Sequence, residues 1–231
     1  MRMKSLSITV LLICFALVAS SAWADSVTVN NGTFADFNTL NLTAGCDAGC
    51  AYNAGPIPGW TIDGNGGSWQ PGPTGPGTPY FSQPVPDGSI VAFINGTLSQ
   101  DLGVTLTPDT FYTLTVDVGD RLDGFQGGWS IALEDGGAPM CTNSGATASL
   151  SAGTFTPETC SFETGATVPS GDLSIVLGGT GAGDNATFAD VTVNTPEPSS
   201  VALLGIGLLL VALVGVFYRR KHGLQAEAYV S

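Results

Sequence analysis

Hydrophobic and polar residues alternate along several short stretches in the middle of this 231-residue chain. In the segment FYTLTVDV, Tyr112, Leu114, Val116 and Val118 fall on one face and polar residues on the other. Side chains alternate with a period of two along a strand, so this pattern predicts a β-strand with one buried face. Similar patterns predict strands at 26–29, 59–62, 89–94, 98–104, 129–134, 148–150, 160–162, 173–177 and 191–193.

Turn-forming residues separate these stretches, for example Asn31-Gly32, Asp87-Gly88 and Asn95-Gly96. Short strands at this spacing predict an all-β fold, a jelly roll or β-sandwich of about 8–10 strands. Residues 63–86 do not fit, because they are rich in Gly and Pro and show no alternation. A loop this long in a compact domain is usually functional or disordered.

The N-terminus has the three parts of a secretory signal peptide. Arg2 and Lys4 supply positive charge, 6–18 is apolar, and Ala22-Trp23-Ala24 has the small-residue cleavage pattern. We expect a signal peptide at 1–24, cleaved after Ala24, followed by a β-sandwich ectodomain at 25–194.

The C-terminal end has the composition of a membrane anchor. An uncharged apolar run and its flanks cover 199–218, long enough to cross a bilayer as one helix. Arg219, Arg220 and Lys221 follow it and would stay cytoplasmic, with a cytoplasmic tail at 222–231. The sequence therefore predicts a single C-terminal transmembrane helix.

Charge is distributed very unevenly. Segment 25–198 holds 18 of the 19 acidic residues and one base, Arg121. Nucleic-acid affinity comes mainly from Lys and Arg contacts to phosphate, so a nucleic-acid partner is not expected. The acidic surface fits either a solubility role outside the cytoplasm or binding of divalent cations by carboxylates.

Four cysteines follow the signal peptide, and disulfides are the default in an oxidising compartment. Four cysteines allow three pairings. We favour the two local pairs, Cys46–Cys50 and Cys141–Cys160, because each brackets a Gly-rich loop or a hairpin.

The residues of the usual catalytic machineries are missing from 25–198. The one histidine, His222, lies in the predicted tail, and 25–198 has no lysine. A Ser-His-Asp or Cys-His arrangement cannot be built without histidine, and no pair of carboxylates is set apart for glycoside hydrolysis. These observations predict a protein that is not an enzyme.

Binding candidates remain, because sugar sites in β-sandwiches use aromatic faces together with polar side chains. Trp60 and Trp129 belong to alternating segments and are predicted to lie in the core. The 63–86 loop and the one base of the domain supply the glycan-binding candidates: Trp69, Tyr80, Phe81, Gln83 and Arg121.

Residues 195–221 resemble the PEP-CTERM sorting signal of bacterial surface proteins. The resemblance rests on Pro196-Glu197-Pro198, the apolar helix at 199–218 and the basic cluster at 219–221, in that order. It implies export through the Sec translocon, a transient stay in the inner membrane and processing by an exosortase. The final location would be the cell envelope or the extracellular matrix.

Residues 25–194 resemble the galactose-binding-like jelly rolls of many carbohydrate-binding modules. The matching segments are VNNGTF, PGW, GSIVAF, LSQDL, LTPDTFYTLTVDVG and ATFADVTV. Such domains often carry a structural calcium where the first and last strands meet. The matching positions for calcium here are Asn31, Thr33, Asp36 and Asp190.

Together these features give two functional hypotheses. The first is an exported, non-catalytic surface or matrix protein that is associated with exopolysaccharide and biofilm. The alternative is a carbohydrate-binding module that recognises one glycan through the 63–86 loop.

Overall fold

The structure is a computed structural model of the chain. It describes residues 25–36, 43–44, 49–86, 89–124, 127–181, 185–195, 207, 210–211 and 214. The chain divides into two compact units. The first is Asp25–Pro196, and the second consists of Met1–Ala24 and Glu197–Ser231. The described residues of the second unit are helical.

Several predicted features lie outside the described residues. They are the signal peptide, the basic cluster Arg219, Arg220 and Lys221, and the triplet Pro196-Glu197-Pro198. Most of the predicted transmembrane segment at 199–218 is also outside them. Within the described part of the chain, no helix has the length and hydropathy needed to cross a membrane.

The prediction of an all-β, jelly-roll-like fold is confirmed for the Asp25–Pro196 unit. Its described residues form eleven strands and one short 3-10 helix, η2 (Thr147–Ser149). The strands are β1 (Asp25–Val27), β2 (Thr43–Ala44), β3 (Ala51–Ala54), β4 (Thr61–Gln70), β5 (Val91–Thr105), β6 (Phe111–Gly119), β7 (Gly128–Asp135), β8 (Ala138–Ala146), β9 (Phe155–Glu163), β10 (Asp172–Thr180) and β11 (Ala186–Thr195).

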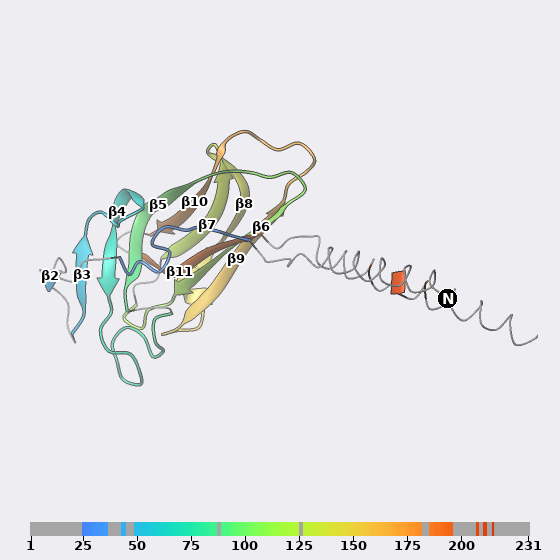
Figure 1. The fold of residues 1–231 in the computed structure, drawn as a ribbon. Helices are drawn as coiled ribbons and strands as arrows, with labels where there is room; N and C mark the ends of the chain where they lie inside the picture. The colour runs from blue at the N-terminus through green and yellow to red at the C-terminus, as the bar shows by residue number, and fades with distance from the viewer. Residues whose placement is uncertain are drawn as a thin grey trace, which may run out of the picture. The chain divides into compact units, whose positions relative to one another are not determined.

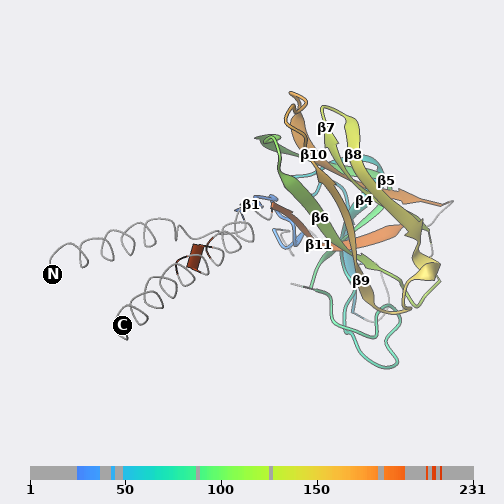
Figure 2. The ribbon, with the colours of Figure 1, turned by 90° about the vertical axis from the view of Figure 1, so that its right-hand side faces the viewer.

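All strands belong to one continuous antiparallel sheet that folds over itself, and β5 joins its two layers. In the first layer, neighbouring strands follow the order β2-β3-β4-β5-β10-β7-β8. The second layer contains β1, β11, β6 and β9. Residues 92–94 of β5 pair with β11, whereas the rest of β5, from Gly96 to Thr105, pairs with β10. Figure 1 shows β4, β5, β10, β7 and β8 side by side, and Figure 2 shows β6, β9 and β11 of the second layer.

The predicted turn at Asn95-Gly96 is instead the middle of β5. Gly96 pairs with Gly64 of β4 and with Gly179 of β10, so three glycines form a row across three strands. A Cβ on Gly96 would lie 2.2 Å from the main-chain oxygen of Asp63, and Gly96 has φ 128°. The glycines allow this close approach and left-handed conformation, so the dipeptide marks the crossing between layers rather than a chain reversal.

Two other local predictions were also wrong. Residues 147–149 form a 3-10 helix instead of the strand predicted at 148–150. Strand β4 continues through Gln70, so the irregular segment begins at Pro71 rather than at 63. Strand β8 was missed because its segment APMCTNSGA shows no alternation of apolar and polar residues.

The main core lies between the two layers of the sheet. It contains the predicted alternating face of β6, with Leu114, Val116 and Val118 fully buried. Trp60 and Trp129, 7% and 5% exposed, also belong to this core, as the sequence pattern predicted. Burial of this apolar surface is the dominant stabilising contribution to the fold.

A disulfide joins Cys141 of β8 to Cys160 of β9, with a Cα–Cα distance of 5.7 Å. This is one of the two predicted pairs. Cys50 is also disulfide-bonded, but Cys46 of the other predicted pair lies outside the described residues. The Cys141–Cys160 bond links the outer strands of the two layers and limits the freedom of the unfolded chain.

Candidate functional site

A second, smaller group of buried aromatic side chains lies on the face of the sheet that points away from the main core. We call Trp69, Tyr80, Phe81 and Phe93, together with the partly buried Phe155 that packs against them, the aromatic cluster. The ring centroids of Trp69 and Tyr80 are 5.1 Å apart, with the rings nearly perpendicular, and those of Phe81 and Phe155 are 4.5 Å apart. Edge-to-face and tilted pairs at these distances are favourable aromatic contacts.

Strand register explains how residues that are distant in sequence meet on this face. Paired residues of neighbouring antiparallel strands point to the same side. Trp69 pairs with Val91, and Ala189 of β11 pairs with Asp117. Because Val91 and Ala189 both pack with the aromatic cluster, the cluster face spans β4, β5, β11 and β6.

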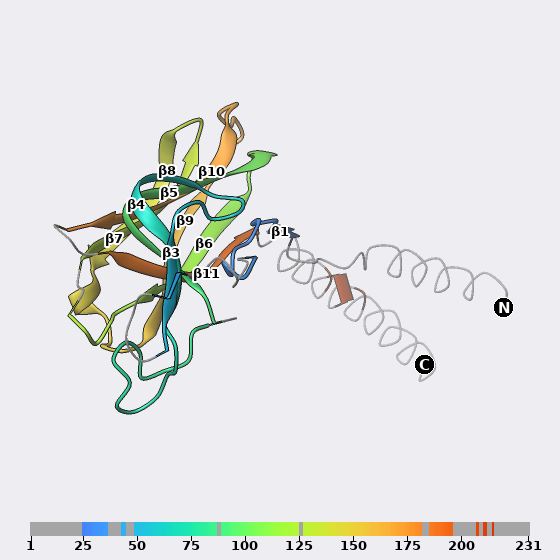
Figure 3. The same ribbon diagram turned by 90° about the vertical axis from the view of Figure 1, so that its left-hand side faces the viewer.

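The segment between β4 and β5 covers this face with its own aromatic side chains. It contributes Tyr80 and Phe81, and it forms an irregular lobe beyond the end of β4 in Figures 1 and 3. The main-chain N–H of Ser82 donates to Gly153 O (2.8 Å), and that of Leu122 donates to Tyr80 O (3.0 Å). These bonds fix the segment over the aromatic cluster, and we call residues 71–86 the roof segment.

Arg121 lies directly on the aromatic cluster. Its guanidinium carbon is 4.3 Å from the centroid of the Trp69 ring and 5.5 Å from that of Tyr80. Its Nε donates to Asp123 Oδ1 (2.9 Å), and its Nη2 pairs with the second oxygen of the same carboxylate. The cation is held by two aromatic faces and one bidentate carboxylate, an arrangement that suits arginine better than lysine.

Asp120 precedes Arg121 and is a buried carboxyl, 1% exposed. Its main-chain N–H donates to Thr154 O and its C=O accepts from Gly153 N, just before β9 begins, and its Oδ1 has no hydrogen-bond partner in the described part of the chain. Burial removes solvation from the charged form and raises the pKa of the Asp120 carboxyl above its ordinary value near 3.8. A carboxyl with a raised pKa is suited to donate a proton.

Four of the five residues predicted to bind glycan do come together here. Trp69, Tyr80, Phe81 and Arg121 contact one another, whereas the side chain of Gln83 is exposed at the surface. The three rings are at most 8% exposed, so they do not form the open platform that the sequence suggested. Sequence reasoning missed Phe93, Phe155 and Asp120, because their burial depends on strand pairing and packing, which the sequence does not show.

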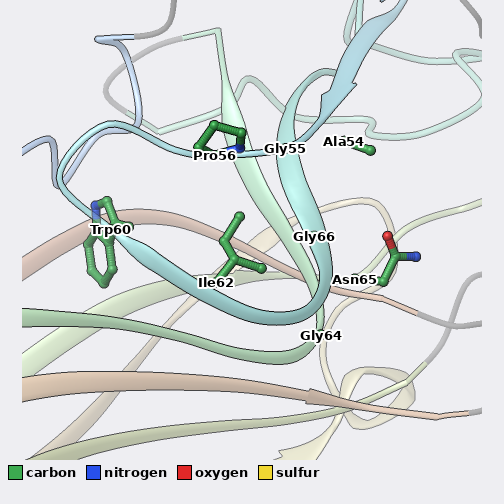
Figure 4. A pocket seen from close by; sticks show the side chains of 8 residues that line it. All are labelled: Ala54, Gly55, Pro56, Trp60, Ile62, Gly64, Asn65 and Gly66. Carbon is green, nitrogen blue, oxygen red and sulfur yellow. The ribbon is translucent and has the colours of Figure 1, made fainter.

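A separate cavity of about 410 Å³ lies beside the first half of β4. Figure 4 shows Pro56 and Trp60 across from Ile62, with the glycines of β4 and Asn65 at its margin. The cavity is large enough for a small molecule. None of its lining residues is titratable, so it offers a surface for binding but no group for proton transfer.

The residues predicted to hold calcium lie where a turn after β1 meets a bulge in β11. Asn31 and Asp190 both have left-handed φ angles, 53° and 42°, and the β11–β6 pairing is irregular between Ala189 and Thr192. The main-chain N–H of Val191 donates to Gly32 O (2.9 Å), which ties the turn to the bulge. Such conformations are uncommon for residues other than glycine and cluster at functional sites.

Some of the oxygen atoms that could bind calcium at this turn already accept hydrogen bonds within the protein. Asn31 Oδ1 accepts a bond from Asp36 N (3.0 Å), and Asn31 O accepts bonds from Phe34 N and Trp60 Nε1. An amide oxygen carries two lone pairs, so this one hydrogen bond does not prevent Asn31 Oδ1 from binding a cation. No group of three or more His, Cys, Asp or Glu residues that could hold a metal occurs in the described ranges.

The family model HpiC1-like, described as HpiC1 cyclase, matches residues 25–204. A cyclase from Fischerella sp. TAU has a TM-score of 0.59 and 24% identity, and the match covers 76% of this chain and 98% of that one. No curated protein matches this chain.

Two further cyclase structures from Fischerella sp. TAU contain bound molecules. One, in complex with 4-(1H-indol-3-yl)butan-2-one, has a TM-score of 0.58 and 24% identity over 74% of this chain and 98% of that one. The Stig cyclase Fisc, in complex with (3Z)-3-(1-methyl-2-pyrrolidinylidene)-3H-indole, has a TM-score of 0.57 and 22% identity over 75% and 98%. At these identities the likeness establishes a shared fold.

The family match overturns four predictions made from the sequence. The identification with PEP-CTERM surface proteins is wrong, because the matched family is a cyclase family and its match runs through the triplet Pro196-Glu197-Pro198 to residue 204. The predictions of a non-catalytic matrix protein and of a protein that is not an enzyme are wrong for the same reason. The expected partners, an exosortase, the Sec translocon and a glycan, fall with that identification.

Proposed function

The chain belongs to the HpiC1-like family, and we propose that it is a cyclase-type enzyme that closes a ring in a small aromatic molecule at the aromatic cluster. We place the active site at the aromatic cluster because of one structural observation. The buried carboxyl of Asp120 stands in the chain between two residues that contact the cluster: Gly119, which faces Phe81 and Phe155, and Arg121, which lies over Trp69.

We propose that Asp120 is the proton donor of this reaction. Burial favours the neutral form of this carboxyl, and in that form it can transfer its proton to a substrate double bond. The electron pair of that double bond forms the new bond to the proton, and the cation left on the substrate is attacked by a second double bond, which closes the ring. Loss of a proton from the cyclised cation to the Asp120 carboxylate restores the acid, so the product is an isomer of the substrate.

The aromatic cluster supports this chemistry in two ways. The faces of aromatic rings carry partial negative charge and stabilise a nearby cation, as they do for the Arg121 guanidinium. The roof segment excludes water, which would otherwise capture a cationic intermediate. Since the rings fill the face in this structure, substrate entry requires the side chains of the roof segment to move.

The substrate class proposed here is an indole-bearing molecule, because two of the structurally similar cyclases are complexes with such molecules. The test is incubation of the purified protein with a panel of 3-alkenylindoles, followed by chromatography and mass spectrometry. We expect one compound to be converted into a product of unchanged mass and new retention time. The absence of both conversion and binding across the panel would overturn the proposal.

We also propose a structural calcium ion at the turn between β1 and β11, with Asn31, Thr33, Asp36 and Asp190 as the residues that would hold it. Calcium prefers oxygen ligands from carboxylates, amides and main-chain carbonyls, which this turn supplies. We expect addition of a calcium chelator to lower the melting temperature, and re-addition of calcium to restore it. An unchanged melting temperature would exclude a stabilising ion.

Finally, we propose that the enzyme acts outside the cytoplasm. The charge and apolar pattern of 1–24 supports export, and so does the disulfide Cys141–Cys160, since such bonds persist in oxidising compartments. A mature N-terminus at Asp25 in protein isolated from its host is the expected result. An intact Met1 would contradict it.

A further inference from the structure

Thr187 of β11 is a buried polar residue without a side-chain hydrogen bond to any residue that the structure describes. Its side chain is fully buried, and its Oγ1 has no hydrogen-bond partner in the described part of the chain. A buried hydroxyl without a partner loses its bonds to water and gains none in return, which costs stability. Such a group in a native structure calls for an explanation.

The register of β11 places this hydroxyl on the side of the aromatic cluster. Ala186 and Phe188 belong to the main core, whereas Ala189 packs with the cluster. Side chains alternate along a strand, so Thr187 points to the same side as Ala189. Its partners across the two neighbouring strands are Phe93 of β5, a member of the cluster, and Gly119 of β6.

Aromatic rings occupy the space beside Thr187. A Cβ built on Gly119 would lie 2.9 Å from a ring carbon of Phe155 and 3.1 Å from one of Phe81. Because position 119 is a glycine and has no side chain, there is room for these two rings next to Thr187. The surroundings of the hydroxyl are apolar on both sides, with Phe93 on one strand and the Phe81–Phe155 pair over the other.

We propose that Thr187 is the specificity-determining residue of this site, and that its Oγ1 accepts a hydrogen bond from a ring N–H of the substrate. The inference rests on the proposed function and sharpens it: the substrate is an apolar aromatic molecule with one ring N–H. When the roof segment moves, an aromatic ring of the substrate can take the place of Phe81. Its N–H then reaches Thr187 Oγ1, a buried acceptor that water does not reach. Sites that hydrogen-bond a buried donor discriminate strongly against analogues that lack it.

The test compares two ligands and four proteins by isothermal titration calorimetry with the full chain. The ligands are indole and 1-methylindole, which differ in the ring N–H. The proteins are the wild type, Thr187→Val, Thr187→Ser and Ser68→Ala. Ser68 is the matched control. Its hydroxyl is also buried and has no hydrogen-bond partner among the described residues, but its strand partner, Ala92, belongs to the main core.

We expect Thr187→Val to weaken indole binding about tenfold and to leave 1-methylindole binding unchanged, since one hydrogen bond is lost. Thr187→Ser and Ser68→Ala should bind indole like the wild type. Without ligand, both Thr187→Val and Ser68→Ala should melt at a higher temperature, because each removes a buried hydroxyl without a partner.

The outcomes separate this inference from the proposed function. If the wild type binds indole and Thr187→Val binds it equally well, the role of Thr187 is refuted while the aromatic site stands. A preference for 1-methylindole over indole in the wild type would refute it as well. If neither ligand binds the wild type, the proposed aromatic site fails, and the inference fails with it.

Discussion

Asp120→Asn should reduce the rate of the proposed cyclisation by about 100- to 10,000-fold, the usual contribution of a general acid. Asparagine keeps the size and polarity of the side chain but cannot transfer a proton. Substrate binding should change little, so the loss should appear in kcat rather than in KM. Single-substrate kinetics measure this difference directly.

Asp63→Asn is the matched control, because Asp63 is an exposed carboxyl on β4. Its activity should equal that of the wild type. If Asp120→Asn keeps full activity, Asp120 is not the acid and the proposed reaction needs another proton donor.

The raised pKa of Asp120 also sets the direction of the pH dependence. The reactive form is the protonated carboxyl, so kcat should fall as the pH rises through the raised pKa. The stability of the fold has the same pH dependence, because the folded state favours the neutral carboxyl. The contribution of Asp120 to the free energy of unfolding is full below pH 3.8 and is lost as the pH rises through the raised pKa. Asp120→Asn should remove this loss and be more stable than the wild type at neutral pH.

Phe81→Ala should lower the free energy of unfolding by about 3–5 kcal/mol, the range for removing a buried phenylalanine ring. Phe81 is fully buried and contacts both Trp69 and Phe155, so its removal leaves a cavity in the aromatic cluster. Chemical denaturation measures the change. In a domain of this size the melting temperature should fall by several degrees for each 2 kcal/mol lost.

Phe111→Ala provides the comparison for this loss. Phe111 begins β6 and is 39% exposed, so its removal creates no enclosed cavity and should cost much less. Equal losses in the two variants would mean that the roof segment does not pack on the cluster as described.

The sequence predicted most of the longer strands correctly, but it predicted the candidate site only in part. Alternation along β6, β7 and β10 identified these strands because each has one buried face. It also assigned Trp60 and Trp129 to the core. The row formed by Gly64, Gly96 and Gly179 could not be seen in advance, because it depends on the pairing of three strands that are distant in sequence.

For a related reason, the sequence predicted only some of the residues of the aromatic cluster. Trp69, Tyr80 and Phe81 stand in one Gly- and Pro-rich segment, which drew attention to them. Phe93 and Thr187 are ordinary strand residues, and only the pairing of β5 with β11 brings them together. The prediction that the chain is not an enzyme rested on the missing histidine and lysine and on the lack of a distinguishable pair of carboxylates. The burial of one carboxyl, Asp120, could not be read from the sequence, because it depends on how the end of β6 packs.

The central claim is that the aromatic cluster, rather than the cavity beside β4, receives an aromatic substrate. The tryptophan indole N–H signals in a ¹H–¹⁵N NMR spectrum test it, because Trp69 lies in the cluster and Trp60 lines the cavity. On titration with indole, we expect the Trp69 signal to shift and the Trp60 signal to stay in place. A shift of Trp60 without a shift of Trp69 would contradict it.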